Sequence, residues 1–203
     1  MTEVALSEAP RRVAALSGEA PLVLIASGPA RVPAPAAARV LAALMGRDGP
    51  VFGVLGAALR GPAAALFLAC DRVLWLPRAS LRLDAGTLGE TVLLSLRLGP
   101  AAANRVWFSG GRLTRREALR SGWAEAHAGP LAHAAAEARR RVEELSPAAL
   151  RLLRPLLLRE HGLARGPAQA LERASFALLF DTGEPAEGAQ AFLEKRKPRF
   201  GKK

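Results

Sequence analysis

The segment from Arg60 to Asp71, RGPAAALFLACD, has the pattern of a tight loop that leads into a buried helix. Backbone N–H groups at such a helix start can face a substrate oxygen and stabilise the negative charge that develops on it. Pro62 has no N–H group, however, and the segment contains no acidic residue before Asp71. The segment therefore has the shape of a helix start that could direct backbone N–H groups at a substrate, but it carries a proline and no acid at that point.

Other residues that often carry chemistry are isolated in this chain. His127, His133 and His161 are the only histidines, and none has a partner at metal-ligand or triad spacing, so we expect solvent-facing or helix-end side chains and no metal site. The single cysteine, Cys70, lies in an apolar helix, which favours a buried small side chain over a nucleophile. The glycines of GVLGAALRG form neither a dinucleotide fingerprint nor a P-loop.

The first half of the chain alternates strand and helix patterns. Residues 21–27, 50–56, 72–76 and 80–83 are short β-rich runs bounded by Gly and Pro, and residues 35–46 form a helical pattern that starts at Pro35 and stops at Gly46. This alternation favours an α/β layered unit with right-handed crossovers.

From residue 100 onward the pattern is almost wholly helical, apart from a short run near GWAEAH. Thr114 and Glu117 predict a capping box, Ser146 and Pro147 start a further helix, and a turn near residues 183–185 separates the last two helices.

Composition narrows the class of protein. The 203 residues are half apolar, no apolar run approaches the roughly 20 residues of a membrane helix, and we expect a cytoplasmic protein. The net charge of +11 comes mostly from scattered arginines, while all four lysines lie in the last nine residues. Without a basic groove interleaved with aromatic residues, nucleic-acid binding is the weaker interpretation of this charge, although a basic nucleic-acid or protein interaction module remains an alternative.

Three stretches in fixed order, together with the tail, resemble the crotonase family of enoyl-CoA hydratases and isomerases. The stretches are LVLIASGPAR, VLGAALRGPAAALFLACDRVLWLPRASLRL and LGPAAANRVWFSGGRLTRREALRSGWAE. The tail, EGAQAFLEKRKPRF, is the most specific match, and its lysines persist in a chain that otherwise uses arginine. The resemblance extends from about residue 20 to the end of the chain.

The resemblance implies a fold and a ligand. The fold is an α/β spiral of ββα units, here a shortened core over residues 1–140, followed by a helical trimerisation region over residues 141–203. The ligand is an acyl-CoA whose thioester oxygen meets two backbone N–H groups, and hydratases add two glutamates as acid and base for water. No other cofactor is implied. Arg31, Lys195 and Lys197 match basic residues near the coenzyme A phosphates, although the two lysines could equally form a solvated helix end.

The chain departs from the family pattern at the reacting centre. The first oxyanion donor falls on Pro35. The segment between Gly56 and Asp71 is one residue longer than the family pattern, so the second donor falls on Pro62 or, if the extra residue is placed after Pro62, on Gly61. The first catalytic glutamate falls on Ala65 or Ala64 and the second on Ala85. Asp84 is one residue from the position of the second glutamate and is the only acid that a small alignment error could place there. Glu90 is a weaker candidate for the catalytic acid or base.

Two functional hypotheses follow from the resemblance. The first is a catalytically degenerate family member that keeps the oligomer and weak acyl-CoA affinity. The second is a working hydratase or isomerase that uses the Gly61 amide and Asp84. The apolar C-terminal helices favour a homotrimer or hexamer, including a mixed assembly with an active relative.

Overall fold

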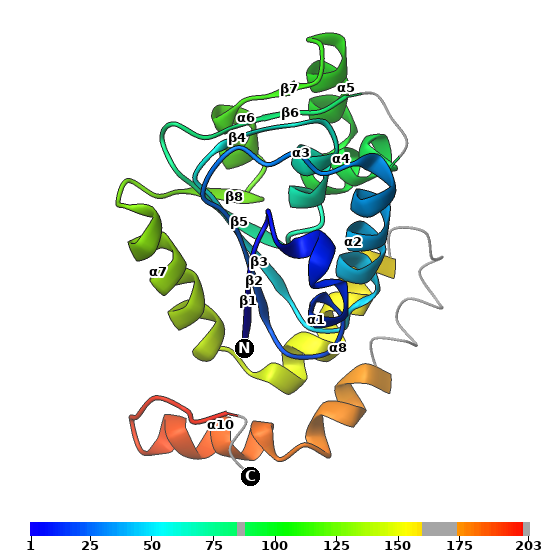
Figure 1. Ribbon diagram of the computed structural model, residues 1–203. Coiled ribbons are helices and arrows are strands. Elements are labelled where there is room, and N and C mark those ends of the chain that lie inside the picture. Colours follow the sequence, from blue (N-terminus) through cyan, green and yellow to red (C-terminus); the bar gives the residue numbers. More distant parts are fainter. Residues whose placement is uncertain (85–87, 160–173, 201–203) are drawn as a thin grey trace.

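The structure is a computed structural model that describes residues 1–84, 88–159 and 174–200, and it contains two β-sheets (Figure 1). In the large sheet, five parallel strands lie in the order β1-β2-β3-β5-β8. These strands are β1 (Thr2–Ala5), β2 (Leu22–Ala26), β3 (Val51–Leu55), β5 (Arg72–Trp75) and β8 (Ala124–Ala126). β2 is buried on both faces, which explains its unbroken apolar sequence.

The small sheet has the order β4-β6-β7, with β4 (Ala58–Arg60) and β6 (Ser80–Arg82) parallel and β7 (Arg112–Leu113) antiparallel to β6. The chain passes from β3 in the large sheet to β4 in the small sheet and then into helix α3 (Gly61–Phe67). It repeats this path from β5 to β6 to α4 (Glu90–Leu98). The predicted spiral of ββα units is thus confirmed.

The remaining helices surround the sheets. They are η1 (Ala9–Arg11), α1 (Val13–Leu16), α2 (Ala34–Gly46), α5 (Pro100–Phe108), α6 (Arg115–Arg120), α7 (Leu131–Glu143), α8 (Pro147–Arg159) and α10 (Glu184–Leu193). Residues 174–180 are also helical. Among the described residues, no helix combines the length and the apolar character that crossing a bilayer would require. The assignment to the cytoplasm stays a prediction.

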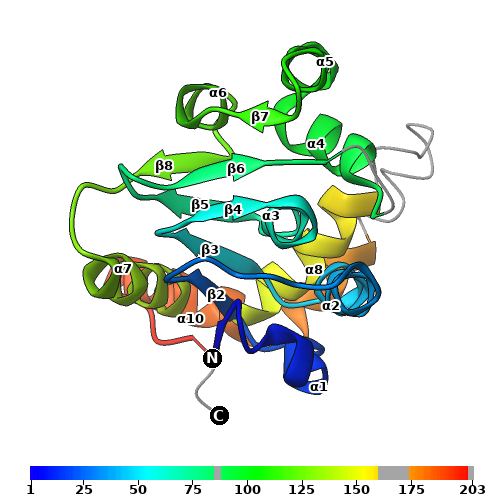
Figure 2. The same ribbon diagram turned by 45° about the horizontal axis from the view of Figure 1, so that its top comes forward.

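The large sheet separates two apolar clusters. On one face, side chains of β2, β3 and β5 pack against α7, as Figure 2 also indicates from the place of α7 beside the sheet. On the other face the main core gathers side chains from the small sheet and from α2 and α3, including Phe67 of α3, around Trp75 of β5; both aromatic side chains are fully buried. The start of α3 therefore lies on a rigid, densely packed base.

Most predicted elements are present, with corrections at particular points. Thr114 and Glu117 form the predicted capping box, with the Glu117 N–H donating to Thr114 Oγ1 over 3.2 Å. The prediction for His127 was wrong: its side chain is 14% exposed, and Nδ1 lies 3.0 Å from Glu137 Oε2. His133 is exposed, as expected, and His161 lies outside the described residues. The proposed boundary between residues 140 and 141 falls inside α7 and stays a prediction.

Candidate functional site

A cavity of about 510 Å³ lies where β4 ends and α3 begins. One wall is the segment 29–33 that leads from β2 to α2, and Figure 2 shows this segment running beside β4. The other wall comes from β4, the first residues of α3 and the residue after β6. The cavity is lined by Pro29, Ala30, Arg31, Val32, Pro33, Ala58, Arg60, Gly61, Pro62 and Asp84. The structure thus brings together four predicted site residues: Arg31, Gly61, Pro62 and Asp84.

Gly61 adopts a backbone conformation that other residues rarely take. Its φ angle is +52°, in the left-handed region, at the first position of α3. A Cβ atom at this position would lie 2.6 Å from Oδ2 of Asp84. Glycine is therefore required for two independent reasons, and its backbone lies next to the Asp84 carboxylate.

The helix starts around the cavity offer few N–H donors. The first N–H groups of a helix have no carbonyl partner within it, which makes them the natural donors to a bound oxyanion. Pro62 is the second residue of α3 and Pro35 the second residue of α2, and neither has an N–H group. Proline is favourable at these positions for the helix, because its fixed φ suits the first turn. Gly61 and Ala63 keep their N–H groups in the first turn of α3.

Carboxylates are equally scarce. The first catalytic glutamate of the family aligns with Ala64 or Ala65. Both residues are fully buried in α3, so either alignment places a methyl group in the core instead of an acid. Glu90 is 4% exposed, and its Oε2 accepts a hydrogen bond from the Leu88 N–H over 3.0 Å, so it serves the start of α4. Ala85 lies outside the described residues. Among the described residues, Asp84 is the only acid that lines the cavity.

Comparison with known proteins decides the family. Residues 50–203 match the sequence model of the family described as enoyl-CoA hydratase/isomerase. The chain belongs to the enoyl-CoA hydratase/isomerase family. The matched range contains Gly61, Pro62, Asp84 and the tail, whereas Arg31 and Pro35 precede it.

Comparisons with individual relatives agree with the assignment to the enoyl-CoA hydratase/isomerase family. A Thermus thermophilus protein named as an enoyl-CoA hydratase is 35% identical over 156 residues, which cover 71% of this chain and 61% of that protein. A solved enoyl-CoA hydratase/isomerase from Cupriavidus metallidurans superposes with a TM-score of 0.76 at 26% identity, covering 89% of this chain and 78% of that one. An enoyl-CoA hydratase structure from Bacillus anthracis, at 21% identity and a TM-score of 0.80, supports the fold. The match thus covers less than two thirds of the Thermus protein.

The basic tail of this family member does not reach the cavity within one chain. Figure 1 shows α10 and the following residues at the opposite end of the molecule from β4 and α3. Lys197 Nζ lies 2.9 Å from Glu144 Oε1, and Lys195 has a φ of +53° at the end of α10. The structure therefore places Arg31 at the cavity but not Lys195 or Lys197, and a coenzyme A role for these lysines requires a second copy of the chain.

A buried charge cluster fixes the C-terminal end of the segment that contains α3. Asp71 Oδ2 accepts hydrogen bonds from the Val51 N–H over 2.8 Å and from Arg154 Nε over 2.7 Å, while Oδ1 lies 3.4 Å from Arg97 Nη2. Arg154 also donates to the carbonyls of Leu44 and Arg47. This cluster ties α8 to β3 and to the end of α2. Sequence reasoning missed it, because Arg154 is 83 residues from Asp71.

The cluster carries more positive than negative charge. Burial and, to a smaller extent, the nearby Arg154 charge lower the pKa of Arg47 to about 10, although the Asp71 charge opposes both effects. Burial likewise lowers the pKa of Arg97. Asp71 is thus the central counter-ion for several buried or half-buried arginines.

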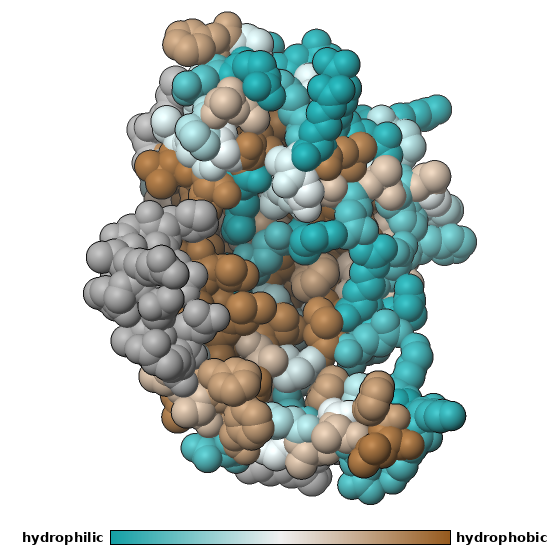
Figure 3. All heavy atoms as spheres, turned by 180° about the vertical axis from the view of Figure 1, so that it is seen from behind, coloured by the Kyte–Doolittle hydropathy of each residue, from teal (hydrophilic) through white to brown (hydrophobic). Residues whose placement is uncertain are grey.

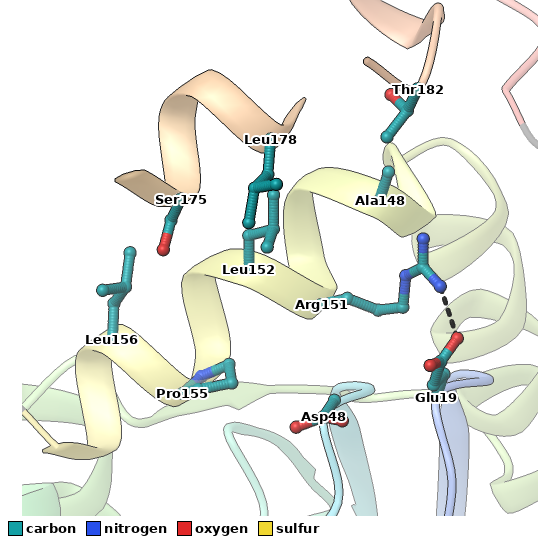
Figure 4. Close-up of a pocket in the computed structure, with 10 residues that line it drawn as sticks. All are labelled: Glu19, Asp48, Ala148, Arg151, Leu152, Pro155, Leu156, Ser175, Leu178 and Thr182. Atoms are coloured by element: carbon teal, nitrogen blue, oxygen red, sulfur yellow. Dashed lines mark hydrogen bonds and ion pairs between the residues drawn. The ribbon is translucent and has the colours of Figure 1, made fainter. Parts of the chain in front are cut away.

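Two further hollows lie between α8 and the C-terminal helices, with volumes of about 410 and 730 Å³. Figure 4 shows the first, where Leu178 and Leu152 point toward each other and the Arg151 side chain extends toward Glu19, with which it is ion-paired. The first is lined mainly by leucine, proline and a surface ion pair. The second also includes the starts of α8 and α10, where Glu184 Oε2 already accepts a hydrogen bond from the Ala148 N–H over 3.3 Å. Both hollows are open grooves between the core and the C-terminal helices.

The described residues contain neither a cluster of metal-binding side chains nor an activated thiol. No group of three or more His, Cys, Asp or Glu side chains is placed to hold a metal ion there. Cys70 is buried as expected, and burial, with the Asp71 charge, raises the pKa of its thiol far above the usual value. A thiolate nucleophile is therefore disfavoured at this position.

Proposed function

We propose that this protein binds a coenzyme A thioester at the cavity between Arg31 and Asp84 and does not hydrate it. The observation that carries the proposal is that one exposed carboxylate, Asp84, lies beside Gly61 at the start of α3, while Ala64 and Ala65 are buried in the core. The family relationship supplies the ligand class, since the relatives bear enoyl-CoA hydratase names.

Hydration demands more than this cavity provides. Water must lose a proton as its oxygen attacks one carbon, while a proton is delivered to the neighbouring carbon, and two positioned acid–base groups normally share this work. The thioester oxygen also needs hydrogen-bond donors, and the loss of one donor costs about 3 to 4 kcal/mol of barrier. Among the described residues, Asp84 is the only acid that lines the cavity, so one of the two acid–base groups is lacking, and Pro62 removes one N–H donor from the start of α3.

A second candidate is double-bond isomerisation, and the closeness of Asp84 to Gly61 favours it. One carboxylate could take a proton from the carbon next to the thioester and return it to another carbon, so no water is consumed. The Gly61 N–H would stabilise the enolate oxygen in between. In this case Asp84→Asn would abolish the activity, whereas a protein that only binds would lose no turnover.

The proposed assembly is a homotrimer or hexamer, alone or mixed with an active relative. Exposed apolar side chains on the C-terminal helices support this assembly. They are Leu153 and Leu157 of α8, Phe176, Leu178 and Phe180 of the helix at residues 174–180, and Phe192 and Leu193 of α10. Figure 3 shows hydrophobic side chains gathered over the middle and lower part of one face. A second copy could also bring Lys195 and Lys197 to the coenzyme A phosphates near Arg31.

Calorimetric titration with crotonyl-CoA tests the proposal. We expect saturable binding by the wild-type protein, about tenfold weaker binding by Arg31→Gln, because a charge-assisted contact is lost, and unchanged binding by Arg11→Gln, which removes an equally exposed arginine from η1. An absence of heat at millimolar crotonyl-CoA would contradict the proposal.

A further inference from the structure

Three arginines lie in register across the small sheet. Arg60 of β4 pairs with Arg82 of β6, and Arg82 pairs in turn with Arg112 of β7. All three side chains are exposed, whereas Leu59, Leu81 and Leu113 beside them are buried, so the arginines share the outer face of the sheet. We call these three residues the arginine ladder. Adjacent strands lie about 4.8 Å apart, so the ladder spans roughly 10 Å.

This arrangement is unfavourable for the isolated protein. Like charges directly opposite each other on neighbouring strands destabilise a sheet. Within the described part of the chain, none of the thirteen ion pairs includes a ladder arginine. By contrast, Arg72 and Arg141 share Glu125 as a partner nearby on β8. The ladder therefore presents uncompensated positive charge.

The ladder is open and adjoins the cavity. Figure 2 shows β4 and β6 in front of the large sheet, with no helix in front of them. Arg60 belongs to both features, since it also lines the cavity, where Arg31 adds a further positive charge and Asp84 a negative one. Four arginines against one aspartate make this face strongly attractive for anions.

We propose that the arginine ladder is a binding site for a small anion with several linked phosphates, such as a nucleotide or inorganic polyphosphate. Guanidinium groups bind phosphate oxygens through two parallel N–H donors, which makes arginine suited to such ligands. Phosphates linked in series can engage adjacent arginines of the ladder at the same time. The proposal goes beyond thioester binding, because it requires neither an acyl chain nor Asp84.

Titration with inorganic tripolyphosphate at low ionic strength tests the site, with adenosine triphosphate as a nucleotide probe whose phosphates are also linked in series. We expect saturable binding of at least one probe, weakened about tenfold or more in Arg82→Gln and in Arg112→Gln, because each removes a charge-assisted contact. The probe that binds more tightly identifies an inorganic or a nucleotide ligand. Arg11→Gln, a matched loss of one exposed arginine in η1 and not in the small sheet, should change the affinity by less than about twofold.

Stability gives a second readout that does not depend on the probe. Arg82→Gln should raise the melting temperature at low salt by relieving the repulsion, and tripolyphosphate should raise the melting temperature of the wild-type protein more than that of the variant. Equal affinity of wild type and Arg82→Gln for both probes would overturn the proposal. Tighter binding of a single-stranded DNA 20-mer than of either probe would also overturn it, because the ladder would then bind nucleic acid. Dissociation of an oligomer in Arg82→Gln would overturn it as well, because the ladder would then contact a second copy of the chain.

Discussion

Oδ2 of Asp84 lies 2.6 Å from the point that a Cβ atom on Gly61 would occupy. The two residues come from different ββα units, Gly61 at the start of α3 and Asp84 after β6, and the parallel pairing of β4 with β6 brings them together. In the proposed function, this contact lies at the place where the thioester would bind.

Gly61→Ala should therefore destabilise the protein. The left-handed backbone alone costs a non-glycine residue about 1 to 2 kcal/mol, and the contact with Asp84 adds to this cost. Chemical denaturation measures the change in the free energy of unfolding. In an Asp84→Ala background, Gly61→Ala should lower the free energy of unfolding only by the cost of the left-handed backbone. Gly28→Ala is the control, because no atom lies within 4 Å of its added Cβ. A Gly61→Ala protein as stable as the wild type would contradict the described geometry.

Asp71→Asn should be among the most destabilising conservative substitutions. It keeps the shape of the side chain but leaves Arg97 and Arg154 without their shared negative charge, and breaking a buried pair costs about 3 to 5 kcal/mol. Arg151→Gln is the comparison, since the exposed Arg151–Glu19 pair is worth about 1 kcal/mol or less. Similar losses of unfolding free energy in the two variants would show that the cluster does not anchor α8.

Acid should loosen the tail through Glu187. Its carboxylate accepts hydrogen bonds from Arg196 and from the Arg199 N–H, which lower its pKa from 4.5 to about 2. A lowered folded-state pKa means that the stabilisation is present above about 4.5 and is lost as the pH falls toward about 2. The Arg199 amide resonance in NMR spectra should shift within that window, and Glu187→Gln should remove the shift. Titration of this resonance only above pH 4.5 would contradict the pairing.

Light scattering should find a trimer or hexamer in solution. Phe192 and Leu193 are 82% and 80% exposed on α10, and a shared interface would bury them. The double variant Phe192→Ser/Leu193→Ser should dissociate the assembly, whereas Phe108→Ser, at the distant end of α5, should leave it intact. A stable wild-type monomer would rule out this assembly.

The sequence predicted those parts of the fold whose signals are local. β2 and β3 are continuous apolar runs between Pro and Gly, and the Thr114–Glu117 capping box needs only residues three apart. β1 was missed, because Thr2–Ala5 is four residues long and holds a glutamate, and β4 was missed, because its three residues precede a helix without a break. Short strands are recognised only by the partners with which they pair.

The candidate site was predictable in its residue types but not in its surroundings. Gly61 and Asp84 could be named because the family resemblance fixes their order along the chain. The register of Arg60, Arg82 and Arg112 depends on strand pairing, which the individual segments do not encode. The Asp71–Arg154 contact joins residues 83 positions apart and needed the packed structure.

The central claim is that the cavity binds an enoyl thioester without adding water to it. The direct measurement is a single-turnover reaction with excess protein, crotonyl-CoA and ¹⁸O-labelled water, followed by mass spectrometry of the thioester. The account predicts no labelled 3-hydroxyacyl product above the level of the Asp84→Asn variant. Labelled product from the wild-type protein that disappears in Asp84→Asn would contradict it.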